Sequence, residues 1–174
     1  NTEDVRFRPV DIKVGPDGAI YVCDLYEPQI SHREHFAGQI DKSNGRIYRL
    51  RGKNAKPIAP FDLSKKSSKE LVATLEHSNK WFRQTAQRLL ADRKDKSIIP
   101  LLKQTLAEKS GQIALEALWA LKVTGGFDEA VALQTLSHDD PFVRLWTVRM
   151  LCDEKQVTTA IAAKLADQAR SETD

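Results

Sequence analysis

The sequence predicts a mostly α-helical chain that begins with a small β part, and two patterns support this. Between Leu75 and Leu151 one sequence pattern occurs three times. Its equivalent leucines are Leu75, Leu106 and Leu136, which lie 31 and 30 residues apart. Before it, residues 1–50 alternate apolar and polar side chains in short runs. A fixed period of about 30 residues is typical of an α-solenoid, in which each unit buries its apolar face only against its neighbours. We therefore predict about three helical repeats preceded by a short antiparallel β-sheet.

The N-terminal segment, residues 1–50, is predicted to supply the sheet. Two strand-like runs flank the sequence Gly-Pro-Asp-Gly at positions 15–18. That sequence favours a hairpin turn, because glycine tolerates the positive φ that such turns need. The predicted strands are 10–14, 19–23 and 45–50, with a polar loop at 27–44 before the last.

Residues 51–66 are predicted to be a linker. Pro57 and Pro60 block helix formation and keep this stretch extended. Nine lysines and arginines lie between Lys42 and Lys69, against a single acid. Such a stripe suits phosphate or an acidic partner, or it is simply solvated. We favour a solvated linker and expect no nucleic-acid partner, because the helical part is nearly balanced in charge.

Residues 67–174 carry the helical pattern. Ser67 or Ser68 is a suitable N-cap, and Glu70 falls in the first turn, where a carboxylate is favoured. Apolar residues then recur at three- and four-residue spacing, with polar breaks between helices. The last helix is the first half of a fourth unit, which predicts an exposed apolar edge beside it. The predicted helices cover 71–75 and 82–90, 98–106 and 113–123, 129–136 and 142–151, and about 158–169.

Composition and charge are those of an ordinary globular protein. Of the 174 residues, 41% are apolar and 29% are charged, with a net charge of +3. The apolar runs fall far short of the roughly 18 residues that cross a bilayer, so we expect no membrane contact. The chain opens with Asn1, and its only methionine is Met150. We therefore expect it to be a piece of a longer protein.

The sequence contains no motif of catalysis or cofactor binding that we can assign. Cys23 and Cys152 form neither C-x-x-C nor C-x-x-C-H, the motifs of zinc ribbons and haem attachment. We expect two buried free thiols, with a disulfide as the alternative in an exported protein. Phosphate-binding glycine loops and serine–histidine–acid elbows are also missing from the sequence. We assign no catalytic residue and no cofactor to this chain.

His32 and His35 are the candidate metal ligands. They stand three residues apart, and Cys23, Asp24 and Glu34 lie close to them in the sequence. Imidazole and carboxylate groups are common ligands of zinc and other transition metals. The alternative is a polar surface loop, because the pair falls in a stretch that we expect to be irregular.

Two histidines recur at one place in the repeat, since His77 and His138 each follow their unit leucine by two residues. Each precedes a good N-cap residue, so we expect a structural role in the turn between helices. The three tryptophans do not recur in this way. We expect Trp119 and Trp146 to pack between helices, because aromatic residues at helical spacing are more often core than binding site.

Arg83, Arg144 and Trp81 are the candidate interaction residues. The two arginines follow their unit leucines by eight residues, which places them to line one side of the surface that a solenoid presents. Trp81 lies beside a turn, where its ring can be exposed. The middle unit carries Ala114 at the arginine position, which weakens the recurrence of this surface.

Two resemblances extend these predictions. The paired helices, with Asp-Pro-Phe-Val-Arg at 140–144, resemble HEAT repeats over residues 67–174. Residues 8–22, Arg-Pro-Val-Asp-Ile-Lys-Val-Gly-Pro-Asp-Gly-Ala-Ile-Tyr-Val, resemble a blade of the six-bladed β-propellers of soluble glucose and sorbosone dehydrogenases. Residues 44–50 resemble the strand that closes the last blade.

A blade of this kind followed by HEAT repeats resembles a family of large bacterial exported proteins labelled membrane-bound dehydrogenases. The resemblance implies a periplasmic parent protein with a sugar-dehydrogenase-like propeller, haem c in a later cytochrome domain, and a quinone cofactor. This chain would then be a noncatalytic part whose repeats act as a spacer, or as a scaffold for a protein partner or neighbouring domains. A propeller needs several blades to close, and this chain holds about one. The alternative is a free-standing α-solenoid that binds proteins and has no redox role.

Overall fold

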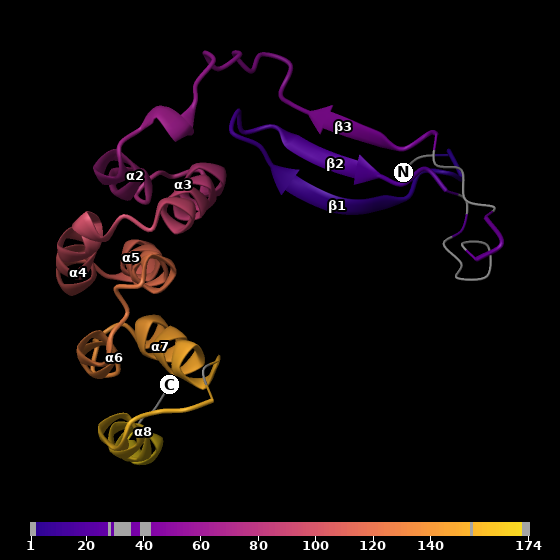
Figure 1. Cartoon of the computed structure of the whole chain (residues 1–174). Coiled ribbons are helices and arrows are strands. Elements are labelled where there is room, and N and C mark those ends of the chain that lie inside the picture. The colour runs from indigo at the N-terminus through magenta and orange to yellow at the C-terminus, as the bar shows by residue number, and fades with distance from the viewer. Residues whose placement is uncertain (1–2, 28, 30–35, 39–42, 154, 172–174) are drawn as a thin grey trace. The chain divides into compact units, whose positions relative to one another are not determined.

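The chain forms two compact units, residues 1–61 and 62–174. Figure 1 shows the strands in the first unit and the helices in the second. No helix in the described part of the chain is both long and apolar enough to span a membrane. The structure is a computed structural model that describes residues 3–27, 29, 36–38, 43–153 and 155–171.

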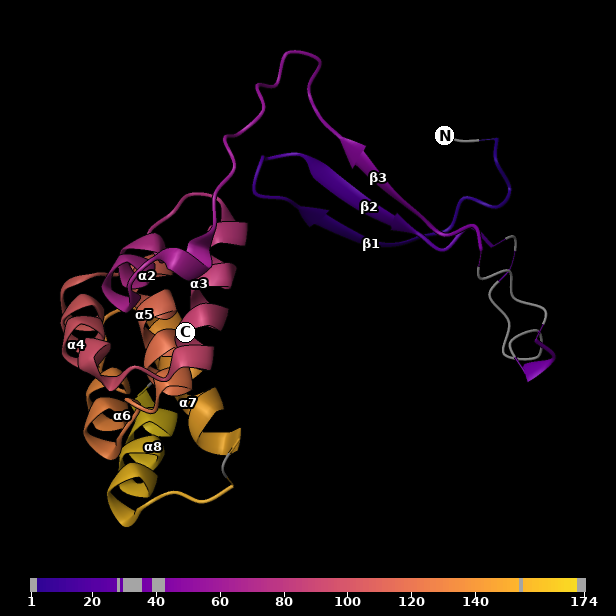
Figure 2. The same ribbon diagram turned by 45° about the horizontal axis from the view of Figure 1, so that its top comes forward.

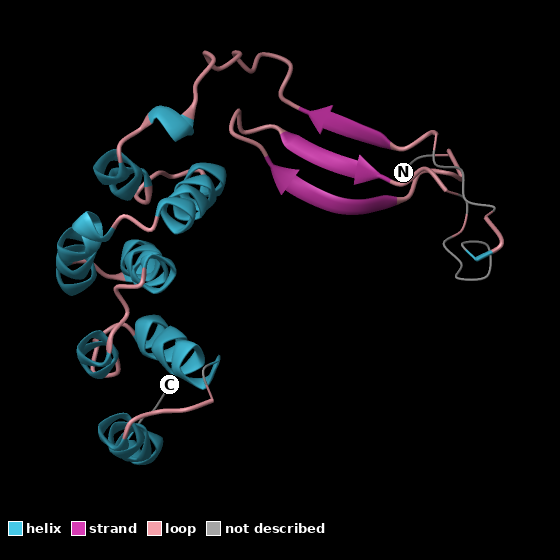
Figure 3. Ribbon diagram, in the orientation of Figure 1, coloured by secondary structure: helices cyan, strands magenta, loops and turns pink. Residues whose placement is uncertain are grey.

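The first unit is a three-stranded antiparallel sheet with the strand order β1-β2-β3 (Figure 3). Strands β1 (Pro9–Val14) and β2 (Ile20–Asp24) form the predicted hairpin, and β3 (Arg46–Leu50) pairs with β2. In the turn, Gly18 has a φ of 73°. That angle lies in the left-handed region, which glycine adopts without steric cost. The predicted hairpin and third strand are confirmed.

One face of the sheet is apolar and largely uncovered. Val22 on the central strand is buried, but Ile12 and Leu50 on the edge strands are 62% and 57% exposed. A three-stranded sheet usually needs such a face covered in order to be stable on its own. Among the described residues of this unit, Phe7 packs edge-to-face on Tyr48 at 5.8 Å, but the apolar residues of the edge strands stay exposed. The register aligns the face in two rows, Ile12–Val22–Tyr48 and Val14–Ile20–Leu50.

The second unit is built from helices in two layers (Figures 1 and 2). The first helices of the repeats form one layer: α2 (Ser68–Thr74), α4 (Ile99–Glu108), α6 (Glu129–Thr135) and α8 (Thr159–Ser171). The second helices form the other: α3 (Lys80–Arg93), α5 (Gly111–Thr124) and α7 (Pro141–Asp153). Each second helix packs against its own first helix, and α5 also packs against both α3 and α7. The predicted solenoid is confirmed. Short 3₁₀ turns, η1 (Leu63–Lys65) and η2 (Lys96–Ile98), precede α2 and α4.

The repeating apolar positions form the core between the layers. The unit leucines, Leu75, Leu106 and Leu136, are all buried. Thr147 stands where the other units have alanine, and its hydroxyl donates to the Val143 carbonyl at 2.8 Å. A buried hydroxyl is tolerated when it finds such a partner one turn back in its own helix. The period of the sequence is therefore the period of the structure.

Local signals set the helix ends. Ser67 caps α2 in a capping box, in which the Glu70 amide donates to the Ser67 hydroxyl and the Ser67 amide donates to the Glu70 carboxylate. Gly125 ends α5 with a φ of 79°, as glycine does after many helices. Gly126 is closely packed, because a Cβ there would lie 2.8 Å from Leu121 Cδ2 and the neighbouring core side chains would have to shift.

Two residues that we placed in breaks begin helices instead. Pro141 is the first residue of α7, and Gly111 is the first of α5. Proline suits the first turn of a helix, where its missing N–H would have had no partner. The Gly111 amide donates to the Asp140 carboxylate of the next repeat at 2.6 Å. This bond satisfies one of the amides that a helix start leaves without an intrahelical partner.

Candidate interaction groove on the second helices

A groove of about 670 Å³ runs over the second helices of all three repeats. Its lining comes from α3, α5 and α7, which are neighbours in one layer. The α3 side is polar and includes Gln84 and Gln87, whereas the α7 side carries Trp146 and Met150. Because three helices contribute, the groove belongs to the array and not to any single repeat.

Glu116 of α5 is the centre of a hydrogen-bond network in this groove. Its side chain is only 4% exposed, and Arg83 of α3 donates from Nε to Glu116 Oε1 at 2.9 Å. Gln112 donates to the same oxygen at 2.9 Å. The Gln87 Nε2 group donates to Glu116 Oε2 at 3.0 Å and to the Glu116 carbonyl at 2.6 Å. A buried carboxylate needs this compensation, so the network fastens α3 to α5.

Trp119 of α5 and Trp146 of α7 supply the aromatic part of the lining. Their ring centroids lie 5.0 Å apart with an interplanar angle of 75°, the edge-to-face geometry that aromatic pairs prefer. The guanidinium of Arg149, an exposed residue, lies 4.7 Å from the Trp146 ring centroid. Both tryptophans pack against the core, which confirms that part of the prediction. Their place in the groove was not predicted.

Two polar atoms of the lining residues have no hydrogen-bond partner. They are Gln87 Oε1 and Trp119 Nε1, both shielded from solvent within the part of the chain that the structure describes. A buried polar group left without a partner costs about 1–3 kcal/mol. Because neither atom is accessible to solvent, neither is offered to a ligand in the groove.

Comparison with protein families gave two matches. HEAT repeats match residues 68–152, which cover α2 to the last turn of α7. The helical unit is a HEAT-like α-solenoid. Residues 1–54 match a domain of unknown function (DUF7133). Comparisons with curated proteins and with solved structures gave no match. Neither family match describes a dehydrogenase, so that resemblance stays a prediction.

The recurring arginines hold the turns within the first and third HEAT units. Arg83 donates from Nη1 to the carbonyls of His77 and Ser78 at 2.8 and 2.9 Å. In the third unit, Arg144 donates from Nη1 to the carbonyls of His138 and Asp139 at 2.9 and 3.0 Å. We call this arrangement the arginine clamp. These arginines therefore recur because both turns are held by the same pair of hydrogen bonds.

The second HEAT unit has no arginine clamp, and its turn explains why. Only Lys109 and Ser110 separate α4 from α5, whereas five residues separate the helices of the other two units, 75–79 and 136–140. A two-residue turn presents fewer free carbonyls for a side chain to bind. Ala114 accordingly occupies the arginine position and is fully buried.

His77 and His138 have the structural role predicted for them. In each, Nδ1 accepts the amide N–H two residues further on, at 2.9 and 3.0 Å. An accepting Nδ1 assigns the ring proton to Nε2 in neutral histidine. In His138, Nε2 lies 3.2 Å from the Leu106 carbonyl and so links the second HEAT unit to the third.

Trp81 and Arg144, predicted as interaction residues, are not among the residues that line the groove. Trp81 is partly buried and packs edge-to-face against Phe82 at 5.2 Å. Arg144 lines a separate apolar cavity of about 730 Å³ between α7 and α8, with Phe142 and Leu145. In the earlier HEAT units the equivalent space is filled by the next second helix. The predicted apolar edge beside the last helix is confirmed.

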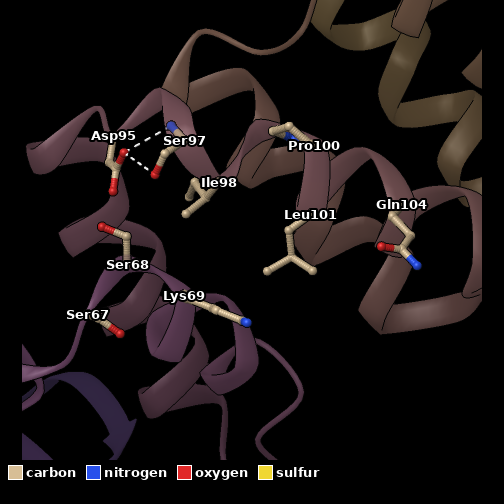
Figure 4. Close-up of a pocket in the computed structure, with 9 residues that line it drawn as sticks. All are labelled: Ser67, Ser68, Lys69, Asp95, Ser97, Ile98, Pro100, Leu101 and Gln104. Atoms are coloured by element: carbon tan, nitrogen blue, oxygen red, sulfur yellow. Dashed lines mark hydrogen bonds between the residues drawn. The ribbon is translucent and has the colours of Figure 1, made fainter.

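A third cavity, of about 510 Å³, lies where the starts of α2 and α4 meet (Figure 4). Asp95 accepts the Ser97 hydroxyl at 2.7 Å and the Ser97 amide at 3.0 Å. The pKa of Asp95 lies below its ordinary value. The largest cause is the hydrogen bond from the Ser97 hydroxyl, followed by one from the Ser68 side chain and then that from the Ser97 amide. Because Asp95 is used to cap η2, we assign this cavity a structural role.

The predicted metal ligands His32 and His35 lie outside the described residues. Within the described ranges, no group of three or more His, Cys, Asp and Glu side chains could hold a metal ion. Cys23 and Cys152 are free thiols in the structure, and the disulfide alternative, which would join the two units, stays a prediction. The expected burial is wrong for Cys152, which is exposed because Leu151 takes the core position in the last turn of α7.

The residues that build the groove were not predicted from the sequence. Glu116 was detectable in principle, because it is the lone acid among inward positions of α5 that are apolar except for Thr124. Gln87 and Trp119 carried no such signal. Neither recurs at its position in the other HEAT units, and both residue types are common on exposed helix faces.

Proposed function

We propose that the whole helical unit, residues 62–174, is a noncatalytic scaffold that binds a protein partner through the groove over α3, α5 and α7. The observation that carries this proposal is the lining, with amide groups towards α3 and aromatic rings towards α7 across three adjacent repeats. Solenoids bind other polypeptides on surfaces that extend over several repeats. Amide and aromatic side chains suit such binding, because they combine hydrogen bonding with large apolar area.

The position of Glu116 supports binding over catalysis. A general base must offer an available oxygen to the proton that it removes. Both Glu116 oxygens already accept hydrogen bonds, from Arg83 and Gln112 on one side and from Gln87 on the other. This carboxylate holds helices together.

A random peptide library displayed on phage tests the scaffold. We expect clones that bind the full chain and lose binding when Gln84→Tyr fills the groove. The matched control is Gln104→Tyr, which alters an exposed glutamine of α4 in the other layer and should leave binding unchanged. If the selected clones bind both variants equally well, the groove is not the binding face and the proposal fails.

We further propose that this scaffold belongs to an exported, dehydrogenase-like redox protein of the bacterial periplasm. The support is the order of its parts, a blade-like antiparallel sheet followed by HEAT repeats. An uncovered apolar sheet face also fits a blade that packs between other blades. In this proposal catalysis lies elsewhere in the parent, and the repeats act as spacer or scaffold towards its other domains.

The redox cofactors of such a parent, haem c and a quinone, find no site that we can assign here. Covalent haem attachment uses C-x-x-C-H, and neither Cys23 nor Cys152 stands in that motif. These residues do not fit haem. The sequence of the parent reading frame tests the redox proposal: we expect further blades upstream and C-x-x-C-H downstream. A parent reading frame without these features would overturn the redox proposal, and the alternative of a free-standing protein-binding solenoid would remain.

A further inference from the structure

Two of the second helices pack between two other helices. Helix α5 packs against α3, the second helix before it, and against its own first helix, α4. Helix α7 packs in the same way against α5 and α6. The apolar cavity of about 730 Å³ between α7 and α8 is the next position in this series, and we call it the α7–α8 cavity. No helix among the described residues occupies it.

The α7 side of this cavity exposes apolar residues at positions that α5 covers. Leu115 and Leu118 of α5 lie nine and twelve residues after their unit leucine, and they are partly and fully buried. At the same two positions α7 carries Leu145 and Val148. Leu145 is 56% exposed, and Phe142, which also lines the cavity, is 62% exposed. The side chains are alike in kind, but only α5 has a later second helix packed against it.

Helix α8 supplies the other apolar wall of the cavity, with Leu165 and Ala169. Exposed apolar side chains gathered on one surface mark a site of contact. An amphipathic helix suits such a cavity, because its backbone groups are paired within the helix and its apolar side chains lie along one face. The two walls belong to the preceding second helix and to a first helix, which are the two elements that α5 and α7 contact in their own positions.

The repeats also indicate one side chain of the missing helix. Helix α3 has Gln84 and Gln87 nine and twelve residues after its unit leucine, and Gln87 donates to Glu116 of the next second helix. Helix α5 has leucines at these two positions, and the next second helix carries Trp146 where α5 carries Glu116. Because α7 offers leucine and valine, we expect an apolar residue at that position of its neighbour.

We infer that the α7–α8 cavity holds the second helix of a fourth repeat, an amphipathic helix that follows α8 in the parent chain. It continues the packing of α7 on α5. The first helices α2, α4 and α6 lead into their second helices through turns of five, two and five residues, so a similar short turn after α8 suffices. The second layer, on which the groove lies, then extends over a fourth repeat. The cavity and the groove share no lining residue, so binding at one does not decide the other.

The test compares this chain with a longer one that adds the next repeat of the parent reading frame, roughly 40 residues. We expect Leu145→Glu to leave the urea midpoint of the present chain nearly unchanged, because Leu145 is exposed there. In the longer chain it should lower the midpoint by roughly 1 M, because the glutamate would be buried without a partner. The matched control is Val123→Glu, which alters an exposed residue of α5 outside the cavity and should have the same effect in both chains.

Hydrogen exchange of α8 gives a second readout. We expect its amides to exchange more slowly in the longer chain, since the added helix would pack against them. Equal effects of Leu145→Glu in the two chains would overturn the inference, and so would a parent reading frame that ends at residue 174. A dimer of the longer chain that Leu145→Glu dissociates in sedimentation equilibrium would assign the cavity to a second copy and overturn it as well.

Discussion

Glu116 shows how one residue ties the fold to the groove. Its partner Arg83 bonds the turn carbonyls of the first HEAT unit and the carboxylate of the second. A buried ion pair adds little net stability compared with an apolar pair, but loss of one member leaves a buried charge uncompensated. Removing one member of the pair should therefore lower the free energy of unfolding strongly, even though the intact pair adds little to it.

Glu116→Ala should lower the free energy of unfolding by about 3–5 kcal/mol, because Arg83 would keep a buried charge without its carboxylate. The Arg83 side chain is only 14% exposed and cannot be solvated freely. Urea unfolding of the full chain, followed by circular dichroism, measures the loss.

The matched control is Asp167→Ala, which removes the acid of a pair with Arg170 in which both side chains are more than 70% exposed. Surface pairs of this kind are worth less than about 1 kcal/mol. Equal losses in the two variants would show that Glu116 is not the centre of the network.

Recurrence in the sequence revealed which residues share a role but not what the role is. Arg83 and Arg144 recur, and we predicted an interaction surface from them. The structure gives their guanidinium groups turn carbonyls to bind, because a five-residue turn leaves such carbonyls within reach. The sequence period fixes the place of a side chain on its helix, whereas its rotamer depends on contacts from other parts of the chain.

The helix starts are sensitive to acid, because their capping carboxylates have lowered pKa values. The pKa of Glu70 lies below its ordinary value, through the hydrogen bond from the Ser67 hydroxyl and then that from the Ser67 amide. The pKa of Asp128, which caps α6, is lowered first by the hydrogen bond from Lys103 and then by the Val131 amide. The same direction holds for Asp62 and Asp95.

Stability should therefore fall in acid. A carboxyl whose pKa is lower in the folded chain stabilises the fold above its unfolded pKa, near 4, and loses that contribution as the pH falls through the folded value. We expect the free energy of unfolding to decline below about pH 4. Urea titrations at a series of pH values measure the slope.

Glu70→Gln isolates one helix start. Glutamine can keep the reciprocal bond of the capping box but has no carboxyl to titrate. The slope of unfolding free energy against pH should become shallower in this variant than in the parent chain. An unchanged slope would mean that Glu70 has the same pKa in the folded and unfolded states.

For the whole molecule, burial is uneven along the solenoid. Helix α5 lies between α3 and α7 and buries seven residues, whereas α8 buries only Ile161. In a solenoid each repeat is stabilised by its neighbours, so an end helix with a single buried residue opens more easily than a central one.

Native-state hydrogen exchange followed by mass spectrometry should rank the helices accordingly. We expect amides of α8 to exchange fastest among the helices and those of α5 slowest. The pairing of α8 with α6, which includes a bond from the Gln168 side chain to the Leu136 carbonyl, slows but does not prevent opening. Protection of α8 as strong as that of α5 would contradict this ranking.

The fold was largely predictable, because the information for it is local or periodic. Apolar spacing located the seven helices of the repeats, and the glycine turn located the hairpin. The groove was not predictable, since it depends on which side chains from α3, α5 and α7 meet across the layer. Gln87 and Trp119, for example, line the groove only because α3 packs beside α5, which no local sequence pattern reveals.

The weak hold on α8 has a mechanical consequence. If the solenoid is pulled between the start of α2 and the end of α8, the last helix detaches first and the repeats behind it follow in order. Each repeat of about 30 residues lengthens the tether by roughly 100 Å when it unravels. Such an array gives way in steps under load, so it can absorb a sudden force between whatever its two ends are joined to.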